Sequence, residues 1–215
     1  MNSVAVIDYG MGNLRSVAKA LEKAEPGVTV NVTSDPEQIR AAGRVVFPGQ
    51  GAMRDCMAEL QNRELDQVVR DCIENKPFLG ICMGLQVLLD FSEENNGRAG
   101  LGIVPGRVRR FADNITDPKT GERLKIPHMG WNQVRQTHAH PLWAGIPQDS
   151  RFYFVHSYYV VPEDTRLVTG ATAYPDEFTS ALAWDNVFAV QFHPEKSQRA
   201  GLRLLANFLQ WNGHA

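Results

Sequence analysis

Residues 78–84 read Phe78-Leu79-Gly80-Ile81-Cys82-Met83-Gly84. The first part of this segment predicts a short buried strand, and the residues from Met83 to Phe91 predict a helix that follows it directly. Cys82 then lies on a tight strand-to-helix turn, where the glycines two positions to either side relieve the crowding of a strained backbone. We expect its sulfur at the carboxyl edge of a sheet, where open α/β folds place ligands, and at a helix N-terminus, which favours the thiolate.

Strand and helix patterns alternate around this segment. Strand-forming runs at 4–7, 28–32 and 44–47 alternate with helical patterns that begin near Leu14, Pro36 and Leu65. This alternation predicts an α/β fold with an open, mostly parallel sheet flanked by helices. After residue 97 the texture changes, and runs such as 107–111 and 152–161 predict an antiparallel extension of the same sheet. A last strand at 187–191 leads into a final helix. We find no repeat or linker, so we expect residues 1–215 to form a single domain.

The composition is that of an ordinary globular protein, with 43% hydrophobic and 21% charged residues and a net charge of -2. No block of like charges indicates a nucleic-acid or membrane partner. The first residues lack the pattern of a signal peptide, and no apolar run approaches the roughly 18 residues of a membrane span. The three cysteines are odd in number and lack metal-ligand spacing, which predicts a reducing cytoplasm and no metal site. Cys56 and Cys72 fall in helical stretches and are expected to be structural.

A possible base for the Cys82 thiolate lies far downstream, in His193-Pro194-Glu195 after the last predicted strand. His193 could take and return a proton, while Glu195 could orient the imidazole and stabilise its charged form. Alone, such a tripeptide also fits a surface turn. Because Cys82 and His193 both follow predicted strands at the carboxyl edge, we expect them to meet in space.

An acyl-transfer site also needs donors for a developing oxyanion. The backbone N–H of Met83 is one candidate. The N–H of Gln50 in Pro48-Gly49-Gln50-Gly51 is another, because a glycine on each side lets it turn into the site. A plain glycine-proline loop is the alternative interpretation.

These three segments together resemble the class I (triad-type) glutamine amidotransferases, which carry a Pro-Gly-x-Gly loop, a cysteine elbow with Gln four residues later, and a late His-Pro-Glu. Gln86 stands at the required position, and the resemblance covers nearly the whole chain. It implies a glutaminase that needs no metal or organic cofactor, with Cys82, His193 and Glu195 as its triad. Glu94 would face the substrate ammonium, although Ser92-Glu93-Glu94 also fits a solvated helix end. The implied ligands of L-glutamine are Gly49, Gly51, Gln86, Glu94, Tyr153 and Ser157.

Within that family, residues 8–14, 128–132 and 153–158 are similar to the glutaminase subunits of imidazole glycerol phosphate synthase. This resemblance implies a heterodimer with a (β/α)8-barrel cyclase, which uses the ammonia to make imidazole glycerol phosphate and AICAR in histidine biosynthesis. Met129, Trp131 and Lys196 are the implied interface residues. The chain departs from the family in one respect, since Gln50 stands where Val is common.

Two other functions remain open at this point. One is the glutaminase subunit of another amidotransferase, in anthranilate or pyridoxal phosphate synthesis. The other is a catalytically silent sensor or binding protein on the same fold. Intact Cys82, His193 and Glu195 argue against the silent protein.

Overall fold

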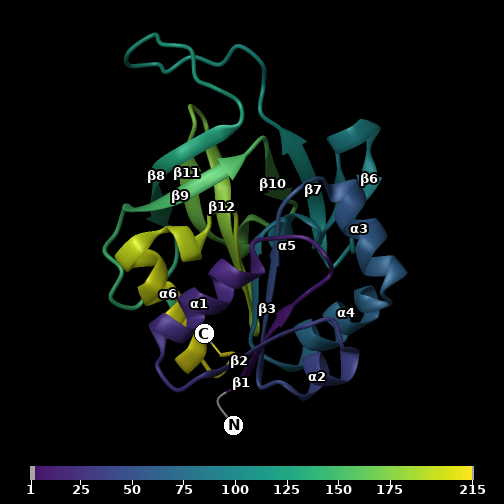
Figure 1. The fold of residues 1–215 in the computed structure, drawn as a ribbon. Helices are drawn as coiled ribbons and strands as arrows, with labels where there is room; N and C mark the ends of the chain where they lie inside the picture. The colour runs from purple at the N-terminus through teal and green to yellow at the C-terminus, as the bar shows by residue number, and fades with distance from the viewer. Residues whose placement is uncertain (1–2, 215) are drawn as a thin grey trace.

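The computed structural model describes residues 3–214 and is built around one twisted sheet (Figure 1). Five neighbouring strands of this sheet, called the parallel half below, run in the same direction. The central ones are buried apolar runs, as expected for strands covered on both faces. In spatial order the parallel strands are β2 (Thr29–Thr33), β1 (Ser3–Ile7), β3 (Arg44–Gly49), β4 (Phe78–Cys82) and β13 (Val187–Val190).

The other half of the sheet starts where β12 pairs antiparallel with β13. The order continues through β12 (Glu177–Trp184), β10 (Tyr158–Pro162), β7 (Val104–Arg110), β5 (Leu89–Ser92) and β6 (Arg98–Ala99). A branch joins β11 (Val168–Ala173) to β12 and to β8 (His128–Gln136), which pairs with β9 (Ser150–His156). The expected α/β class, an open sheet with an antiparallel extension, is therefore confirmed.

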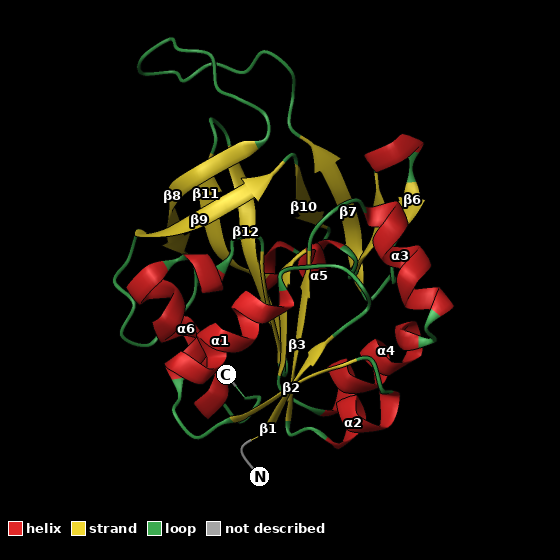
Figure 2. Ribbon diagram, in the orientation of Figure 1, coloured by secondary structure: helices red, strands yellow, loops and turns green. Residues whose placement is uncertain are grey.

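Helices cover both faces of the parallel half (Figure 2). On β1, Val4 and Val6 pack toward one face, and Ala5 and Ile7 pack toward the other, because successive strand residues point to opposite sides. The first face is covered by α1 (Leu14–Ala24) and α6 (Gln198–Gln210), and the second by α2 (Pro36–Ala41), α3 (Met53–Asn62) and α4 (Leu65–Asn75). Short 3-10 turns are η1 (Glu94–Asn96), η2 (Pro141–Trp143), η3 (Thr165–Leu167) and η4 (Pro194–Lys196).

The helix predicted from Met83 to Phe91 is wrong in its length. The structure has the short helix α5 (Met83–Gln86), after which the chain continues into the short strand β5. In a helix the Leu88 carbonyl would accept from residue 92. Here it accepts from the N–H groups of Ile103 and Val104, so the neighbouring segment 100–104 replaces the helical ladder.

The single strand predicted over residues 152–161 is two strands in the structure. Strand β9 ends at His156, β10 begins at Tyr158, and the carbonyl of Ser157 between them accepts from the N–H of Phe111. The two strands pair with different partners, β8 and β7. The break at Ser157 lets one continuous apolar run serve two parts of the sheet.

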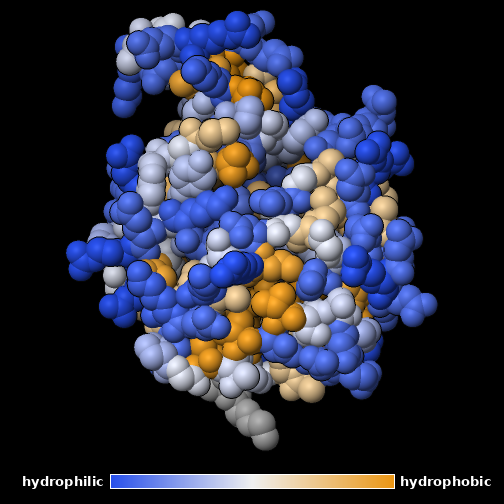
Figure 3. Space-filling view, viewed as in Figure 1, coloured by the Kyte–Doolittle hydropathy of each residue, from blue (hydrophilic) through white to orange (hydrophobic). Residues whose placement is uncertain are grey.

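The surface seen in Figure 3 is largely hydrophilic, with apolar atoms gathered low in the view where the edge strand β2 runs. Among the residues that the structure describes, three large hydrophobic side chains are exposed: Val32 on β2, and Met129 and Trp131 on β8. Over residues 3–214, none of the helices has the length and apolar character that a bilayer crossing needs. In the same residues no cluster of His, Cys, Asp or Glu has the arrangement of a metal site.

Candidate active site

Cys82 is the last residue of β4, and its backbone is strained, with φ 56° and ψ -105°. Such a conformation costs a non-glycine residue on the order of 1–3 kcal/mol and persists only where the surroundings enforce it. Here the surroundings are tight. A Cβ at Gly84 would overlap the carbonyl oxygen of Phe47, and one at Gly80 would lie 2.7 Å from the Gly84 carbonyl. The two glycines thus let α5 start directly against β3.

His193 reaches the same place from the neighbouring strand. Strand β13 pairs in parallel with β4, with Val190 opposite Ile81, so both chains leave the sheet at the same edge. The backbone N–H of His193 donates to the carbonyl of Tyr153 at 2.9 Å, and its own carbonyl accepts from the Ser197 hydroxyl at 2.6 Å. These contacts fix the turn that carries the imidazole.

Glu195 lies behind the imidazole, with its carboxylate oxygen Oε1 2.9 Å from Nδ1 of His193. Both side chains are almost fully buried. Burial opposes a charge on His193, but the nearby Cys82 sulfur and the bonded Glu195 carboxylate outweigh it and raise the pKa of His193. Among residues 3–214, Nε2 of His193 has no hydrogen-bond partner. The ring is therefore held by one nitrogen and free to exchange a proton at the other.

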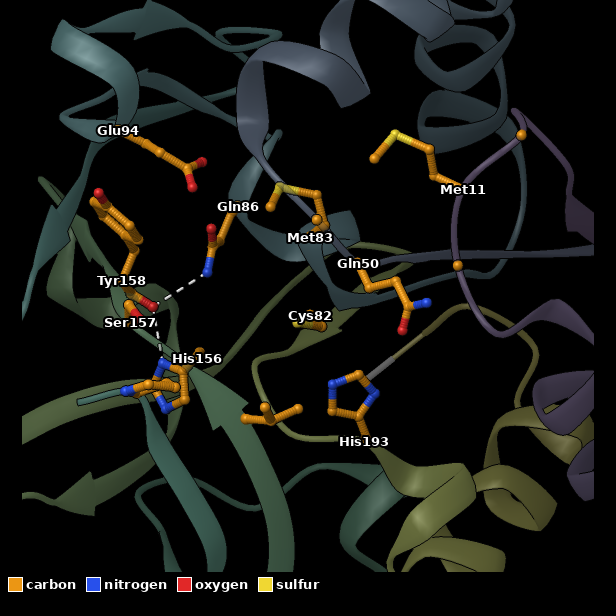
Figure 4. A pocket seen from close by; sticks show the side chains of 15 residues that line it. Met11, Gln50, Cys82, Met83, Gln86, Glu94, His156, Ser157, Tyr158 and His193 are labelled. Carbon is orange, nitrogen blue, oxygen red and sulfur yellow. Dashed lines mark hydrogen bonds between the residues drawn. The ribbon is translucent and has the colours of Figure 1, made fainter. Parts of the chain in front are cut away.

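A cavity of about 780 Å³ opens above Cys82. Figure 4 shows the sulfur between the His193 ring on one side and Gln86 and Glu94 on the other. Of the residues predicted to form the site, those that line this cavity are Gln50, Gly51, Cys82, Met83, Gln86, Glu94, Ser157 and His193.

Two predicted glutamine ligands do not line the cavity. Gly49 is not among the lining residues, and a Cβ at this position would overlap the Tyr9 hydroxyl. The absence of a side chain therefore lets the loop pass close to Tyr9. Tyr153 uses its backbone to hold the His193 turn, and its ring contacts Trp131 and Lys196 instead.

Gln86 and Glu94 each have one oxygen that faces the cavity and one polar atom that is hydrogen-bonded to the backbone. The Gln86 amide Nε2 donates to the carbonyl of Tyr158 at 3.1 Å, which leaves its Oε1 for a ligand. Glu94 follows β5 rather than ending a helix, and its Oε2 accepts from the backbone N–H of Met53 at 2.6 Å. A fixed carboxylate at this position suits an ammonium group.

The predicted oxyanion donors lie on adjacent chains. Gly49 at the end of β3 pairs with Cys82 at the end of β4, so Gln50 and Met83 both follow the same sheet edge. The N–H of Met83 is the first of α5 and has no acceptor within that helix. Gly51 has φ 103°, a value that L side chains rarely adopt, so the loop at Gln50 depends on it.

Several cavity residues were not predicted from the sequence. They include Met11 before α1, Pro127 before β8, His156 at the end of β9 and Tyr158 at the start of β10. Residues 8–13 and 153–158 stood out as family-like segments, but nothing in their spacing indicated which side chains face a cavity.

His156 belongs to a buried hydrogen-bonded chain that fixes its own protons. His156 Nδ1 faces the carbonyl of Tyr158 at 2.8 Å, and because a carbonyl only accepts, this nitrogen carries the proton. His156 Nε2 then accepts from Nδ1 of His128 at 2.9 Å, and Nε2 of His128 accepts from Asn132 at 3.2 Å. Both rings are therefore neutral in this arrangement.

We expect acid to destabilise the protein through these two rings. Burial lowers the pKa of His128 to about 4 and the pKa of His156 to about 3, below the unfolded value of 6.5. Since the unfolded chain binds protons first, stability is complete above pH 6.5 and falls as the pH drops toward the folded values. Each ring contributes a loss of about 2 kcal/mol at about pH 5. Urea unfolding above pH 6.5 and at about pH 5 measures this loss of unfolding free energy.

His156→Gln is the matched variant, because an amide can donate and accept but does not titrate over this range. Its unfolding free energy should change less between neutral and acidic pH than that of the parent chain. An unchanged pH dependence of the unfolding free energy in this variant would show that His156 does not contribute to the loss.

The exposed face of β8 lies close to the triad. Met129 and Trp131 are 62% and 38% exposed and, being two residues apart on a strand, point to the same side. The centroid of the Trp131 ring lies 6.1 Å from that of the Tyr153 ring. Lys196 Nζ lies over the Tyr153 ring, 5.9 Å from its centroid. A chain of side chains thus connects this face to the residue that follows Glu195.

Comparison with known proteins places this chain in a family. Residues 5–211 match the family model of the class-I glutamine amidotransferases. The chain is 64% identical over 213 residues to the imidazole glycerol phosphate synthase subunit HisH of Nitrosococcus oceani, covering 99% of both chains. It is 62% identical over 212 residues to the HisH subunit of Methylococcus capsulatus, covering 98% of this chain and 97% of the relative.

Solved structures agree on the fold. A putative GMP synthase protein from Thermoplasma acidophilum superposes with a TM-score of 0.69 at 17% identity, covering 97% of this chain and 92% of that one. The chain therefore belongs to the class-I glutamine amidotransferase family and, within it, to the group of imidazole glycerol phosphate synthase HisH subunits.

Proposed function

We propose that this protein is the glutaminase subunit of an imidazole glycerol phosphate synthase, acting in histidine biosynthesis in the cytoplasm. The observation that carries the proposal is the strained Cys82 elbow facing the His193–Glu195 pair across one cavity, in a chain of this family. Its three cysteines are unpaired thiols, as a reducing compartment allows.

The chemistry is an acyl transfer through a thioester. The Cys82 thiolate adds to the carboxamide carbon of L-glutamine, and the oxygen takes up the negative charge between the N–H groups of Met83 and Gln50. His193, protonated at Nε2 and oriented by Glu195, gives that proton to the departing nitrogen, and ammonia leaves. His193 then takes a proton from water, which attacks the thioester and releases glutamate with the free thiol.

The cavity offers complementary groups for the rest of the substrate. The carboxylate of Glu94 suits the α-ammonium, and the free Oε1 of Gln86 accepts a further N–H. Ser157 and the backbone of Gly51 line the same space. These groups fix the α-carbon end, so that the carboxamide end lies over the sulfur.

The ammonia is used by a partner in this proposal, a (β/α)8-barrel cyclase that forms imidazole glycerol phosphate and AICAR. The HisH relatives are named as subunits of that synthase. The exposed pair Met129 and Trp131, with Lys196 nearby, is the surface we assign to the heterodimer. Exposed apolar and aromatic side chains on one strand face are typical of such contacts.

The test is glutamine hydrolysis measured with and without a candidate cyclase and its nucleotide substrate. We expect the isolated chain to be slower by about tenfold or more, a coupling of ordinary size. The reason is that Gln50 lies between two glycines, where its peptide can turn away from the site until the partner is loaded. Equal rates with and without the loaded partner would refute this activation.

Two matched variants connect the activation to the assigned surface. Met129→Glu should weaken the stimulation by the cyclase, whereas Val32→Glu, at an exposed apolar position on β2, should leave it intact. Absence of hydrolysis under every condition would favour a silent binding protein. Co-purification with a chorismate-using subunit would favour a different amidotransferase.

A further inference from the structure

Gln191 is a fully buried polar residue that directly contacts the reacting sulfur. It follows the last residue of β13, and its backbone N–H donates to the carbonyl of Ser180 at 2.9 Å. Its side-chain Nε2 lies 3.6 Å from Sγ of Cys82, within hydrogen-bonding distance for sulfur. The catalytic steps derived above do not use this residue.

The orientation of the Gln191 amide is forced by its neighbours. Gln86 Nε2 donates to two oxygens, the Tyr158 carbonyl at 3.1 Å and Oε1 of Gln191 at 3.0 Å. Turning the Gln86 amide over would place its oxygen against the Tyr158 carbonyl, so this donor direction is fixed. The oxygen of Gln191 therefore faces Gln86, and its N–H faces the sulfur.

We propose that Gln191 is a positioning residue that holds the Cys82 thiolate by an N–H···S hydrogen bond and couples it to the substrate-facing amide of Gln86. This inference rests on the proposed glutaminase function. A donor favours the charged sulfur over the neutral thiol, because the thiolate is the better acceptor. The same bond fixes the direction of the sulfur on its strained turn.

The two ends of the Gln191 side chain have separate tasks. The oxygen end holds Gln86, whose own oxygen faces the cavity, and the nitrogen end holds the nucleophile. A substrate that displaces Gln86 would therefore also disturb the sulfur. We expect loss of Gln191 to lower kcat and to raise KM for glutamine together.

The experiment is the alkylation of Cys82 in the full chain by iodoacetamide, measured from about pH 5 to about pH 10 by mass spectrometry of the Cys82 peptide. The variants are Gln191→Met, which fills the space without a donor, and Gln191→Glu, which keeps the acceptor for Gln86 but adds a negative charge. Cys56, whose pKa burial raises to about 12, serves as an unreactive internal reference. Gln136→Met is the matched control, because Gln136 also makes side-chain hydrogen bonds from a strand but lies outside the cavity lining.

The other ionisable groups around the sulfur stay the same in every variant. They are His193 with Glu195 on the η4 side, Tyr9 after β1, and Cys56 of α3 in contact with Tyr9. A shift between variants therefore reports the change at residue 191.

We expect the midpoint of the alkylation profile to move up by about one pH unit in Gln191→Met, a roughly tenfold slower reaction below both midpoints. Gln191→Glu should move it further, because a carboxylate beside the thiolate is a like charge. The Gln136→Met profile should match that of the parent chain. Thermal unfolding shows whether each variant folds.

Profiles of both Gln191 variants that coincide with the parent profile would overturn the inference. Failure of both variants to fold would also overturn it, since Gln191 would then be needed for stability and not for positioning. The proposed function fails separately, when the parent chain hydrolyses no glutamine with the loaded cyclase and its Cys82 is not selectively alkylated.

Discussion

Cys82→Ala is expected to lose glutamine hydrolysis by a factor on the order of 10⁴ or more, because no other group can form the thioester. The cyclase in the same complex should still turn over when ammonium salt is supplied. The substitution leaves the cavity, the His193–Glu195 pair and the exposed face of β8 in place. Glutamine-dependent and ammonium-dependent rates of one reconstituted complex measure both outcomes.

Cys72→Ala is the matched control for this experiment. Cys72 is a second buried thiol, on the face of α4 that packs into the apolar core. Its removal should cost about 1 kcal/mol of stability and leave both activities nearly unchanged. Retained hydrolysis in Cys82→Ala would remove the sulfur from the mechanism. Loss of the ammonium-dependent rate as well would contradict the division of labour between the subunits.

Gly84→Ala is expected to destabilise the fold by about 3 kcal/mol or more, because its Cβ would overlap the backbone carbonyl of Phe47 on β3. A backbone group cannot turn aside as a flexible side chain can, so α5 must move away from β3. For a chain of this size the melting temperature should fall by about 10 °C. The movement of α5 would also displace the N–H of Met83 and lower the rate of glutamine hydrolysis. Thermal unfolding and glutamine hydrolysis measure the two effects.

Gly121→Ala separates this overlap from ordinary backbone strain. Gly121 has φ 72°, and no atom lies within 4 Å of a Cβ placed there. It should cost only about 1 kcal/mol, the penalty of a left-handed conformation for alanine. If Gly84→Ala melts no lower than Gly121→Ala, the close approach at the elbow is not what stabilises this turn.

The parallel half of the sheet could be predicted from the sequence because its signals are local. The run at residues 4–7, the Pro-Gly ending of β3 and the strand at 78–82 each carry their own pattern. The carboxyl ends of parallel strands lie at one edge of the sheet. The sequence alone therefore predicted that Cys82, His193 and Gln50 lie close together at that edge. Their roles in catalysis remain predictions.

The region after α5 could not be predicted, because its apolar residues fit more than one structure. Leu85, Val87, Leu88 and Leu89 are all buried, which matches a buried helix as well as a short strand. The choice is made by residues 100–104, whose N–H groups donate hydrogen bonds to the carbonyls of residues 87–90. Gly100 permits this approach, since a Cβ there would overlap the Leu89 carbonyl.

By itself the sequence determined the cysteine elbow, because Gly80, Cys82 and Gly84 are near neighbours whose spacing constrains one turn. Only the tertiary structure decided what surrounds the sulfur. The Gln191 amide is 109 residues away in the chain and meets it because β13 pairs beside β4. Such contacts depend on which strands become neighbours, and the order of the strands in the sheet cannot be predicted from the sequence of a single segment. The feature that local spacing predicts is the nucleophile, and the groups that orient it come from the assembled sheet.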